Sequence, residues 1–164
     1  MQRGQAMLET VIAVLFISFL FLGLFQLSHL MTAKILCDHA AARAARARAV
    51  GFNDFMCLKS ARVAVIPVAG ERRGPEAGTD FVELARIPIY LCTDTPALAN
   101  GVLEYERWGT MKMDVDSGFG ISPTAEAEIS MQMPRFLGSG GGIEIEGKAE
   151  IESHYPFYIQ DQGL

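Results

Sequence analysis

The sequence of 164 residues has little charge and few cysteines. Only 20% of its residues are charged, and 14 basic against 19 acidic side chains give a formal net charge of −5. An acidic chain does not favour nucleic-acid binding, so we expect no nucleic-acid partner. Half of the residues are hydrophobic, which argues against a disordered chain. Three cysteines are too few for a miniprotein held together mainly by disulfides.

The sequence also lacks the motifs of common catalytic and metal sites. Cys37, Cys57 and Cys92 do not have the paired spacing of a zinc site. Residues 114–118 (DVDSG) resemble a fragment of a calcium loop, but the downstream glutamate is absent. There is no Walker phosphate loop, nucleophile elbow or HExxH motif. The sequence therefore predicts a protein that is not an enzyme and has no metal or cofactor.

Charge is absent from one long apolar run near the N-terminus. In residues 11–25 (VIAVLFISFLFLGLF) only Ser18 and Gly23 interrupt the apolar side chains. As a helix this run spans roughly 22 Å, and flanking residues extend it toward the ~30 Å of a bilayer core. A segment that is apolar on all sides needs apolar surroundings, so we interpret it as a membrane helix. A cleaved secretory signal would need a better cleavage site than residues 26–31 offer. A buried core helix would need the rest of the chain to surround it.

The helical pattern continues beyond the apolar run. Residues 26–50 contain neither proline nor glycine and are rich in alanine, and Gly51 followed by Asn53 reads as a stop. The sequence thus predicts one helix from about Gln5 to Val50, roughly 69 Å long. We expect one of its faces to pack on its own domain and another on neighbouring subunits.

Glu9 is an acidic residue at the edge of the apolar run. It lies either just outside the lipid or beside a partner cation. Residues 3–10 (RGQAMLET), followed directly by the apolar run, resemble the class III signal of type IV pilins and pseudopilins. Residues 40–51 (AAARAARARAVG) are similar to the Ala/Arg-rich helix end of TadE-like pseudopilins of tight-adherence (Tad) systems.

The resemblance implies a processing site and an assembly residue. A prepilin peptidase would remove the leader 1–4 by cutting after Gly4, so that the mature chain begins at Gln5 and keeps its apolar helix. Glu9, fifth in the mature chain, would pair with the N-terminal amine of a neighbouring subunit. A buried charge is tolerable when it is paired in this way. Many pilins begin with an apolar residue, whereas this mature chain would begin with Gln5.

The resemblance also implies a function, which is that of a minor pilin or pseudopilin in a Tad-type type IV pilus, with a role in initiation, assembly or adhesion. The implied partners are the prepilin peptidase, the major pilin and other minor pilins, an inner-membrane assembly platform, an assembly ATPase, and membrane lipid before assembly. A type II secretion pseudopilin is an alternative. Another is a single-pass membrane-anchored binding module that does not polymerise.

Two arguments disagree on which side of the membrane the C-terminal domain lies. The resemblance implies a single pass through the inner membrane with this domain outside the cytoplasm, and later a place in the cell-surface pilus. The positive-inside rule favours the opposite, because Lys34, Arg43, Arg46 and Arg48 follow the apolar run. The three arginines either contact lipid head groups or acidic partners, or complement the dipole at the helix end.

The rest of the chain predicts a small antiparallel β-sheet domain over 52–164 and therefore an α+β fold. We expect strands at 61–67, 81–92, 125–133 and 143–152. The last two alternate cleanly between apolar and polar residues, as half-exposed strands do. Residues 71–79 and 138–142 read as connections, and 97–108 as a short helix or irregular cover. The acidic outer face of 143–152 is either solvated or meets the arginine-rich helix end. With the domain outside, Cys57–Cys92 is a candidate disulfide, and Cys37 would be a buried side chain on the helix.

Overall fold

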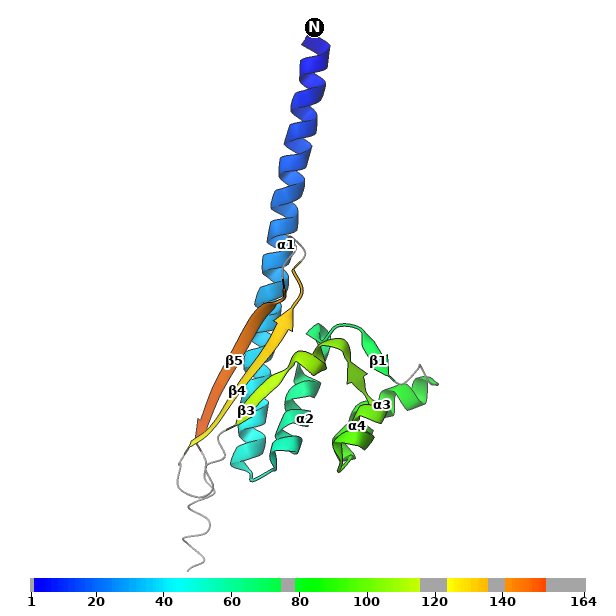
Figure 1. Ribbon diagram of the computed structural model, residues 1–164, viewed down its shortest axis with the longest axis vertical. Helices are drawn as coiled ribbons and strands as arrows, with labels where there is room; N and C mark the ends of the chain where they lie inside the picture. Colours follow the sequence, from blue (N-terminus) through cyan, green and yellow to red (C-terminus); the bar gives the residue numbers. More distant parts are fainter. Residues whose placement is uncertain (1, 75–78, 116–123, 136–140, 153–164) are drawn as a thin grey trace, which may run out of the picture.

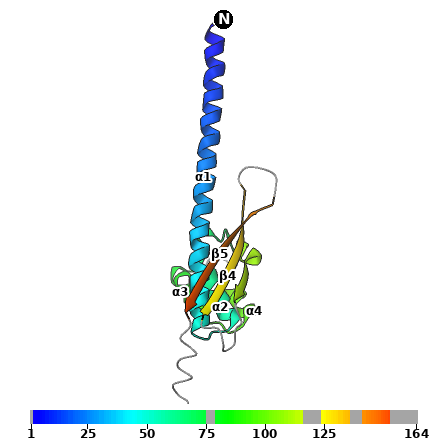
Figure 2. The same cartoon turned by 90° about the vertical axis from the view of Figure 1, so that its left-hand side faces the viewer.

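The chain forms a long helix whose C-terminal half is built into a small mixed domain (Figure 1). The computed structural model describes residues 2–74, 79–115, 124–135 and 141–152. Helix α1 (Gln2–Ala49) projects from the domain, and its N-terminal half stands free in both views (Figures 1 and 2). The other elements are α2 (Asp54–Ala64), the 3-10 helix η1 (Ile66–Val68), β1 (Arg72–Gly74), α3 (Asp80–Cys92), α4 (Pro96–Val102), β2 (Glu104–Tyr105), the 3-10 helix η2 (Glu106–Thr110), β3 (Lys112–Val115), β4 (Thr124–Met133) and β5 (Ile143–Glu152). This arrangement confirms the predicted α+β fold.

A glycine ends α1, as the sequence predicts. Gly51 adopts φ +95°, a left-handed conformation that favours glycine. The amide of Phe52 donates to the carbonyl of Ala47, and the amide of Gly51 donates to that of Arg48. These two bonds form a Schellman motif, which satisfies carbonyls at the helix end. Asn53 then caps α2 by accepting a 2.9 Å bond from the amide of Met56, so the chain reverses within a few residues.

A three-stranded antiparallel sheet packs against α1, in the order β3–β4–β5. Strands β4 and β5 pair along their whole length, from Thr124 opposite Glu152 to Met133 opposite Ile143. The expected strands at 125–133 and 143–152, and the hairpin between them, are therefore confirmed. Alternation along both strands turns the apolar side chains toward α1 and the glutamates outward. A separate two-stranded sheet joins β1 to β2.

Small side chains form the face of α1 that packs in the domain. Its buried residues are Ala33, Cys37, Ala40, Ala41, Ala44 and Ala45. Gly147 of β5 lies directly against this face. A Cβ atom at Gly147 would lie 2.3 Å from the carbonyl carbon of Cys37 and 2.6 Å from the amide nitrogen of Asp38. Strand β5 thus rests on the backbone of α1, an approach that the absence of a side chain at 147 permits.

Two of the expected strands are wrong, because residues 61–67 and 81–92 are mainly helical. In the first segment the buried small residues Cys57, Ala61 and Ala64 recur with helical spacing and pack on α1. In the second, Glu83, Arg86 and Tyr90 form the inward edge of α3. The residues that recur with helical spacing on the buried side of α3 are charged or aromatic. Most of its large aliphatic residues lie on the exposed side, and for that reason the sequence predicted a strand.

The connecting segments follow the expectations in part. Residues 97–108 contain the end of α4, strand β2 and the start of η2, which agrees with the short helix and irregular cover. The expected connection 71–79 includes the short strand β1, and residues 75–78 lie outside the described residues. The same is true of residues 116–118 of the calcium-loop fragment and of 138–140 in the glycine-rich connection.

We predict that Gly147→Ala separates β5 from α1. The added methyl group would overlap the backbone of Cys37, and overpacking of a core costs roughly 1–3 kcal/mol. We expect a lower midpoint of thermal unfolding for the full chain in detergent, followed by circular dichroism. Gly141→Ala is the control, because a Cβ atom there meets no atom within 4 Å. Equal stability of both variants would contradict the close approach.

Candidate functional site: the exposed half of the long helix

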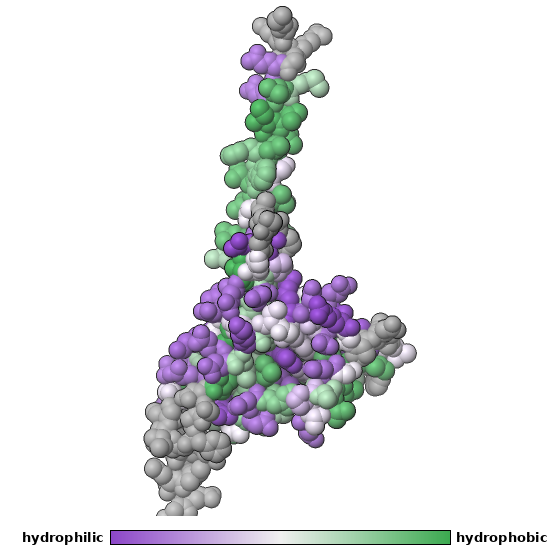
Figure 3. All heavy atoms as spheres, viewed as in Figure 1, coloured by the Kyte–Doolittle hydropathy of each residue, from purple (hydrophilic) through white to green (hydrophobic). Residues whose placement is uncertain are grey.

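The N-terminal half of α1 exposes large apolar side chains on every side. Leu15 is 57% exposed, Phe16 63% and Phe21 70%. We call residues 5–28 of α1 the rod. In Figure 3 hydrophobic residues follow most of the rod, whereas hydrophilic residues dominate the domain surface. Within the described residues, α1 is the one helix that is long and apolar enough to cross a membrane, and none of its most apolar stretch is buried.

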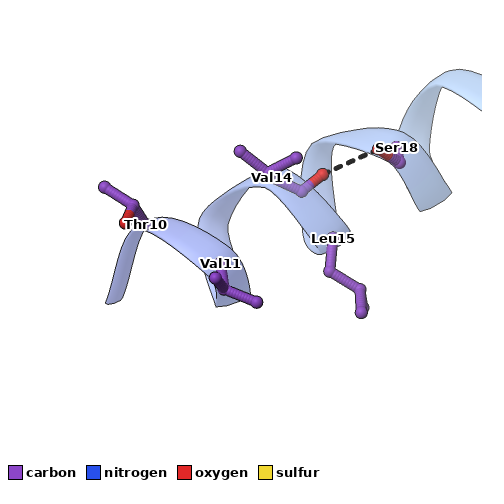
Figure 4. Close-up of a pocket in the computed structure, with 5 residues that line it drawn as sticks. All are labelled: Thr10, Val11, Val14, Leu15 and Ser18. Carbon is purple, nitrogen blue, oxygen red and sulfur yellow. Dashed lines mark hydrogen bonds between the residues drawn. The ribbon is translucent and has the colours of Figure 1, made fainter. Parts of the chain in front are cut away.

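The hydroxyl groups of the rod are satisfied by its own backbone. Thr10 Oγ1 donates to the carbonyls of Ala6 (3.0 Å) and Met7 (2.9 Å). Ser18 Oγ donates to the carbonyl of Val14 at 2.8 Å (Figure 4). These residues border a shallow groove with apolar walls on one side of the helix. Because the hydroxyl protons already have acceptors, these residues do not oppose burial of the rod in lipid or among other helices.

Glu9 and the processing residues lie at the free end of the rod. Glu9 is exposed and makes no ion pair with any residue that the structure describes. Gln5 is exposed one helical turn before Glu9, and α1 runs without a break through Gly4. The described part of the domain therefore leaves Gln5 and Glu9 open to other molecules, and it does not itself supply a cation for Glu9.

The arginines at the other end of α1 differ in their surroundings. The Arg48 side chain is only 16% exposed, and its Nη1 atom lies 3.0 Å from Asp54 Oδ1. The same nitrogen donates to the carbonyl of Phe52 at 3.3 Å, so Arg48 holds the turn from α1 to α2. Arg43 is half-buried and Arg46 is exposed. Of the three, Arg46 is the most available for an intermolecular contact.

The three cysteines are free, and they differ in access to solvent. Cys37 and Cys57 are fully buried, the former as predicted for the helix face, whereas Cys92 is exposed at the end of α3. Burial raises the pKa of the Cys57 thiol, and the nearby Arg48 partly opposes this. The candidate Cys57–Cys92 disulfide is not formed in the structure.

Sequence analysis missed two buried cations that hold α3 in place. Lys59 is fully buried on α2, and its Nζ atom donates to the carbonyl of Leu91 at 2.9 Å and to that of Thr93. It thereby caps the C-terminal end of α3. Arg86 is 7% exposed and lies 2.9 Å from Glu83. A single lysine in an otherwise ordinary helix carries no sequence signal for such a role.

The described residues contain no group of three or more His, Cys, Asp or Glu side chains that would hold a metal ion. What α1 provides is a long exposed apolar surface. A free apolar rod joined to a small α+β domain that packs on the helix's other half defines a pilin-like protein.

Comparison with known families agrees with this class. Residues 4–46, which lie within α1, match the family model described as TadE-like protein. The resemblance seen in the sequence is thus confirmed for the helix, and it implies a pilin-like protein associated with a Tad pilus. Comparisons with curated proteins and with solved structures give no match.

Proposed function

We propose that this chain is a minor pilin or pseudopilin subunit of a Tad-type type IV pilus. In this role it is a structural protein that acts in pilus initiation, assembly or adhesion, and not an enzyme. The observation that carries the proposal is the rod, whose apolar side chains are exposed all round while the other half of the same helix is built into the domain. Such a helix is stable first in lipid and later among other subunits.

The length of the rod supports a stay in the membrane. The first fully buried residue of α1 is Ala33. At ~1.5 Å per residue, the helix from Gln5 to Ala33 spans ~42 Å, which matches the ~40–45 Å of a bilayer with its head groups. The domain would then begin where the membrane ends, with the rod immersed and the domain in water.

Distance from the rod weakens the objection from the positive-inside rule. Arg43, Arg46 and Arg48 lie 15, 18 and 20 residues beyond Ser28, the last residue of the rod. They are at the edge of the window of about 15–20 residues over which the rule counts basic side chains. We propose that the chain crosses the inner membrane once with its domain outside the cytoplasm, and that it then enters the pilus at the cell surface.

Processing and assembly would take place at the free end of the rod. We propose that a prepilin peptidase cuts between Gly4 and Gln5, which leaves the apolar helix on the mature chain. Glu9 would then pair with the Gln5 amine of a neighbouring subunit, because an unpaired carboxylate among apolar helices is costly. The partners we propose are the assembly platform, its ATPase, the major pilin and other minor pilins.

The exposed thiol of Cys92 reports which side of the membrane holds the domain. We expect a membrane-impermeant maleimide to label the chain in cells with an intact inner membrane, because Cys92 is exposed while Cys37 and Cys57 are buried. The Cys92→Ser variant is the control and should stay unlabelled. Labelling only after permeabilisation would place the domain in the cytoplasm. Labelling only after reduction would indicate the Cys57–Cys92 disulfide.

Cleavage of the leader is a second test. We expect N-terminal sequencing of the mature protein to begin at Gln5, and co-expression with an inactive prepilin peptidase to leave the full chain. Mass spectrometry of the intact protein measures the same difference. A membrane-bound chain that keeps Met1 in the presence of the active peptidase would support the anchored module that does not polymerise.

Replacement of Glu9 separates membrane insertion from assembly. We expect Glu9→Ala to insert normally, since loss of a charge makes the rod more apolar. The variant should nevertheless fail to enter sheared pili, because the pairing with the neighbouring amine is lost. Glu9→Asp keeps the charge and should retain part of the incorporation. Normal amounts of Glu9→Ala in pili, measured by immunoblotting against the membrane fraction, would contradict the assigned role.

A further inference from the structure

Helix α3 is turned with the side chains of Glu83 and Arg86 inward. Arg86 is 7% exposed and pairs with Glu83, which also pairs with Arg72 of β1. Tyr90 is fully buried, with its ring centroid 5.3 Å from that of Trp108. The domain therefore holds α3 by a polar and aromatic edge, which is the reverse of an ordinary surface helix.

The remaining surface of α3 is apolar and exposed. Leu84 is 81% exposed, and three further α3 side chains and Leu98 of α4 are at least 40% exposed. We call these residues the α3 patch: Val82, Leu84, Ile87, Ile89 and Leu98. Glu83 and Arg86 carry the charge between residues 82 and 92, and both face the domain. A cluster of large apolar side chains without charge is typical of a surface that another protein covers.

The position of the patch argues against lipid as its cover. Helix α3 contacts α2 and α4, and Figure 1 places it level with the C-terminal part of α1, on the far side of α2. The rod extends from the opposite end of α1. A bilayer that surrounds the rod therefore does not reach α3, and a protein surface has to cover it.

A second exposed surface lies on α1 itself, within the domain. Ile35 is 67% exposed and Val50 70% exposed, and His39 and Arg46 lie between them on the same side of the helix. We call Ile35, His39, Ala42, Arg46 and Val50 the α1 strip. Ile35, His39, Arg46 and Val50 are exposed and Ala42 is half-buried, so the strip continues the exposed surface of the rod.

We propose that the α3 patch of one copy packs on the α1 strip of a second copy. Within one copy α2 separates the two helices, so the contact forms between copies (Figure 1). Both surfaces carry exposed large apolar residues, and the charges are complementary, since Asp94 follows α3 and Arg46 lies in the strip. Two different surfaces that meet in this way produce an open row of subunits, which suits a filament.

The α3 patch is too small to hold two copies together by itself. Its five side chains offer less than the ~800 Å² per partner of a stable, independent interface. The contact therefore forms only between copies that are already held side by side. The high effective concentration of neighbouring domains then compensates for the small buried area. The inference rests on the proposed function in this respect, because the packed rods would bring the domains together.

Cysteine cross-linking in the full chain, expressed in its own cells, tests the contact. In a Cys92→Ser background, Leu84→Cys is combined with Ile35→Cys, Ala42→Cys or Val50→Cys, one at a time. We expect a short bis-maleimide to give a ladder of dimers and higher species for at least one pair. Each single-cysteine chain should stay monomeric. No ladder with any pair would overturn the inference, as would a dimer from Leu84→Cys alone, or cross-links only to a different protein.

A charge in the patch tests its importance for assembly. We expect Leu84→Glu to lower incorporation into pili about tenfold, because the contact would bury an unpaired carboxylate. Leu84→Met keeps an apolar side chain and should assemble normally. Both variants should unfold at the temperature of the unsubstituted chain, since Leu84 is 81% exposed. Normal incorporation of Leu84→Glu would overturn the inference, and so would strong quenching of a Leu84→Cys fluorophore by spin-labelled lipid.

The outcomes separate this inference from the proposed function. Absence of cross-links while Glu9→Ala blocks entry into pili would overturn the α3 contact and leave the pilus role standing. Cross-links between α3 and the α1 strip in a chain that keeps its leader and never enters pili would support the contact and overturn the pilus role.

Discussion

The close approach of β5 to the backbone of α1 is the constraint on which the rest of the structure depends. Gly147 leaves room for the carbonyl of Cys37, and the facing helix residues are alanines and a cysteine. Because neither side has bulk at this crossing, the hairpin of β4 and β5 lies directly along the helix. This fit lets the larger buried residues of the sheet, Ile129, Met131 and Ile145, pack close to the small face of the helix. The α1 face on the α2 side is small as well, so the helix is held between two layers.

This packing gives the two halves of α1 different properties. The C-terminal half has small residues on its buried face and a mixed surface of basic, polar and a few apolar residues elsewhere, which suits a helix that is partly covered by its own domain. The N-terminal half has large apolar residues on every side and no cover. One continuous helix therefore joins the domain to a segment whose surface is apolar on every side. The small buried residues of α1 begin at Ala33. Their position determines where the domain begins and therefore how much of the helix stays uncovered.

The sequence predicts the parts of the fold whose pattern is carried by apolar residues. The long helix, its stop at Gly51 and the hairpin of β4 and β5 all follow from regular apolar or alternating positions. Residues 61–67, which contain the end of α2 and the start of η1, and residues 81–92 of α3 were expected to be strands. The buried faces of these helices are made of small or charged residues, which give no apolar helical period. In α3 the apolar residues lie on the exposed side, so a rule that places apolar residues inside predicts the wrong period. The apolar rod was predicted from sequence and the role of Glu9 stays a prediction, whereas Lys59 and Arg86 become evident only through their tertiary partners.

The outer face of the sheet is strongly charged, in contrast to the exposed apolar surfaces of the rod and of α3. The outward side chains of β3, β4 and β5 include seven carboxylates and two lysines. Glu126 lies directly opposite Glu150, and Asp114 opposite Glu128, pairings that cost stability in a sheet. Strand β5 is an edge of this sheet, and an exposed edge invites pairing with other chains. Like charges on the outward side of β5 oppose the pairing of this edge with the same edge of another copy.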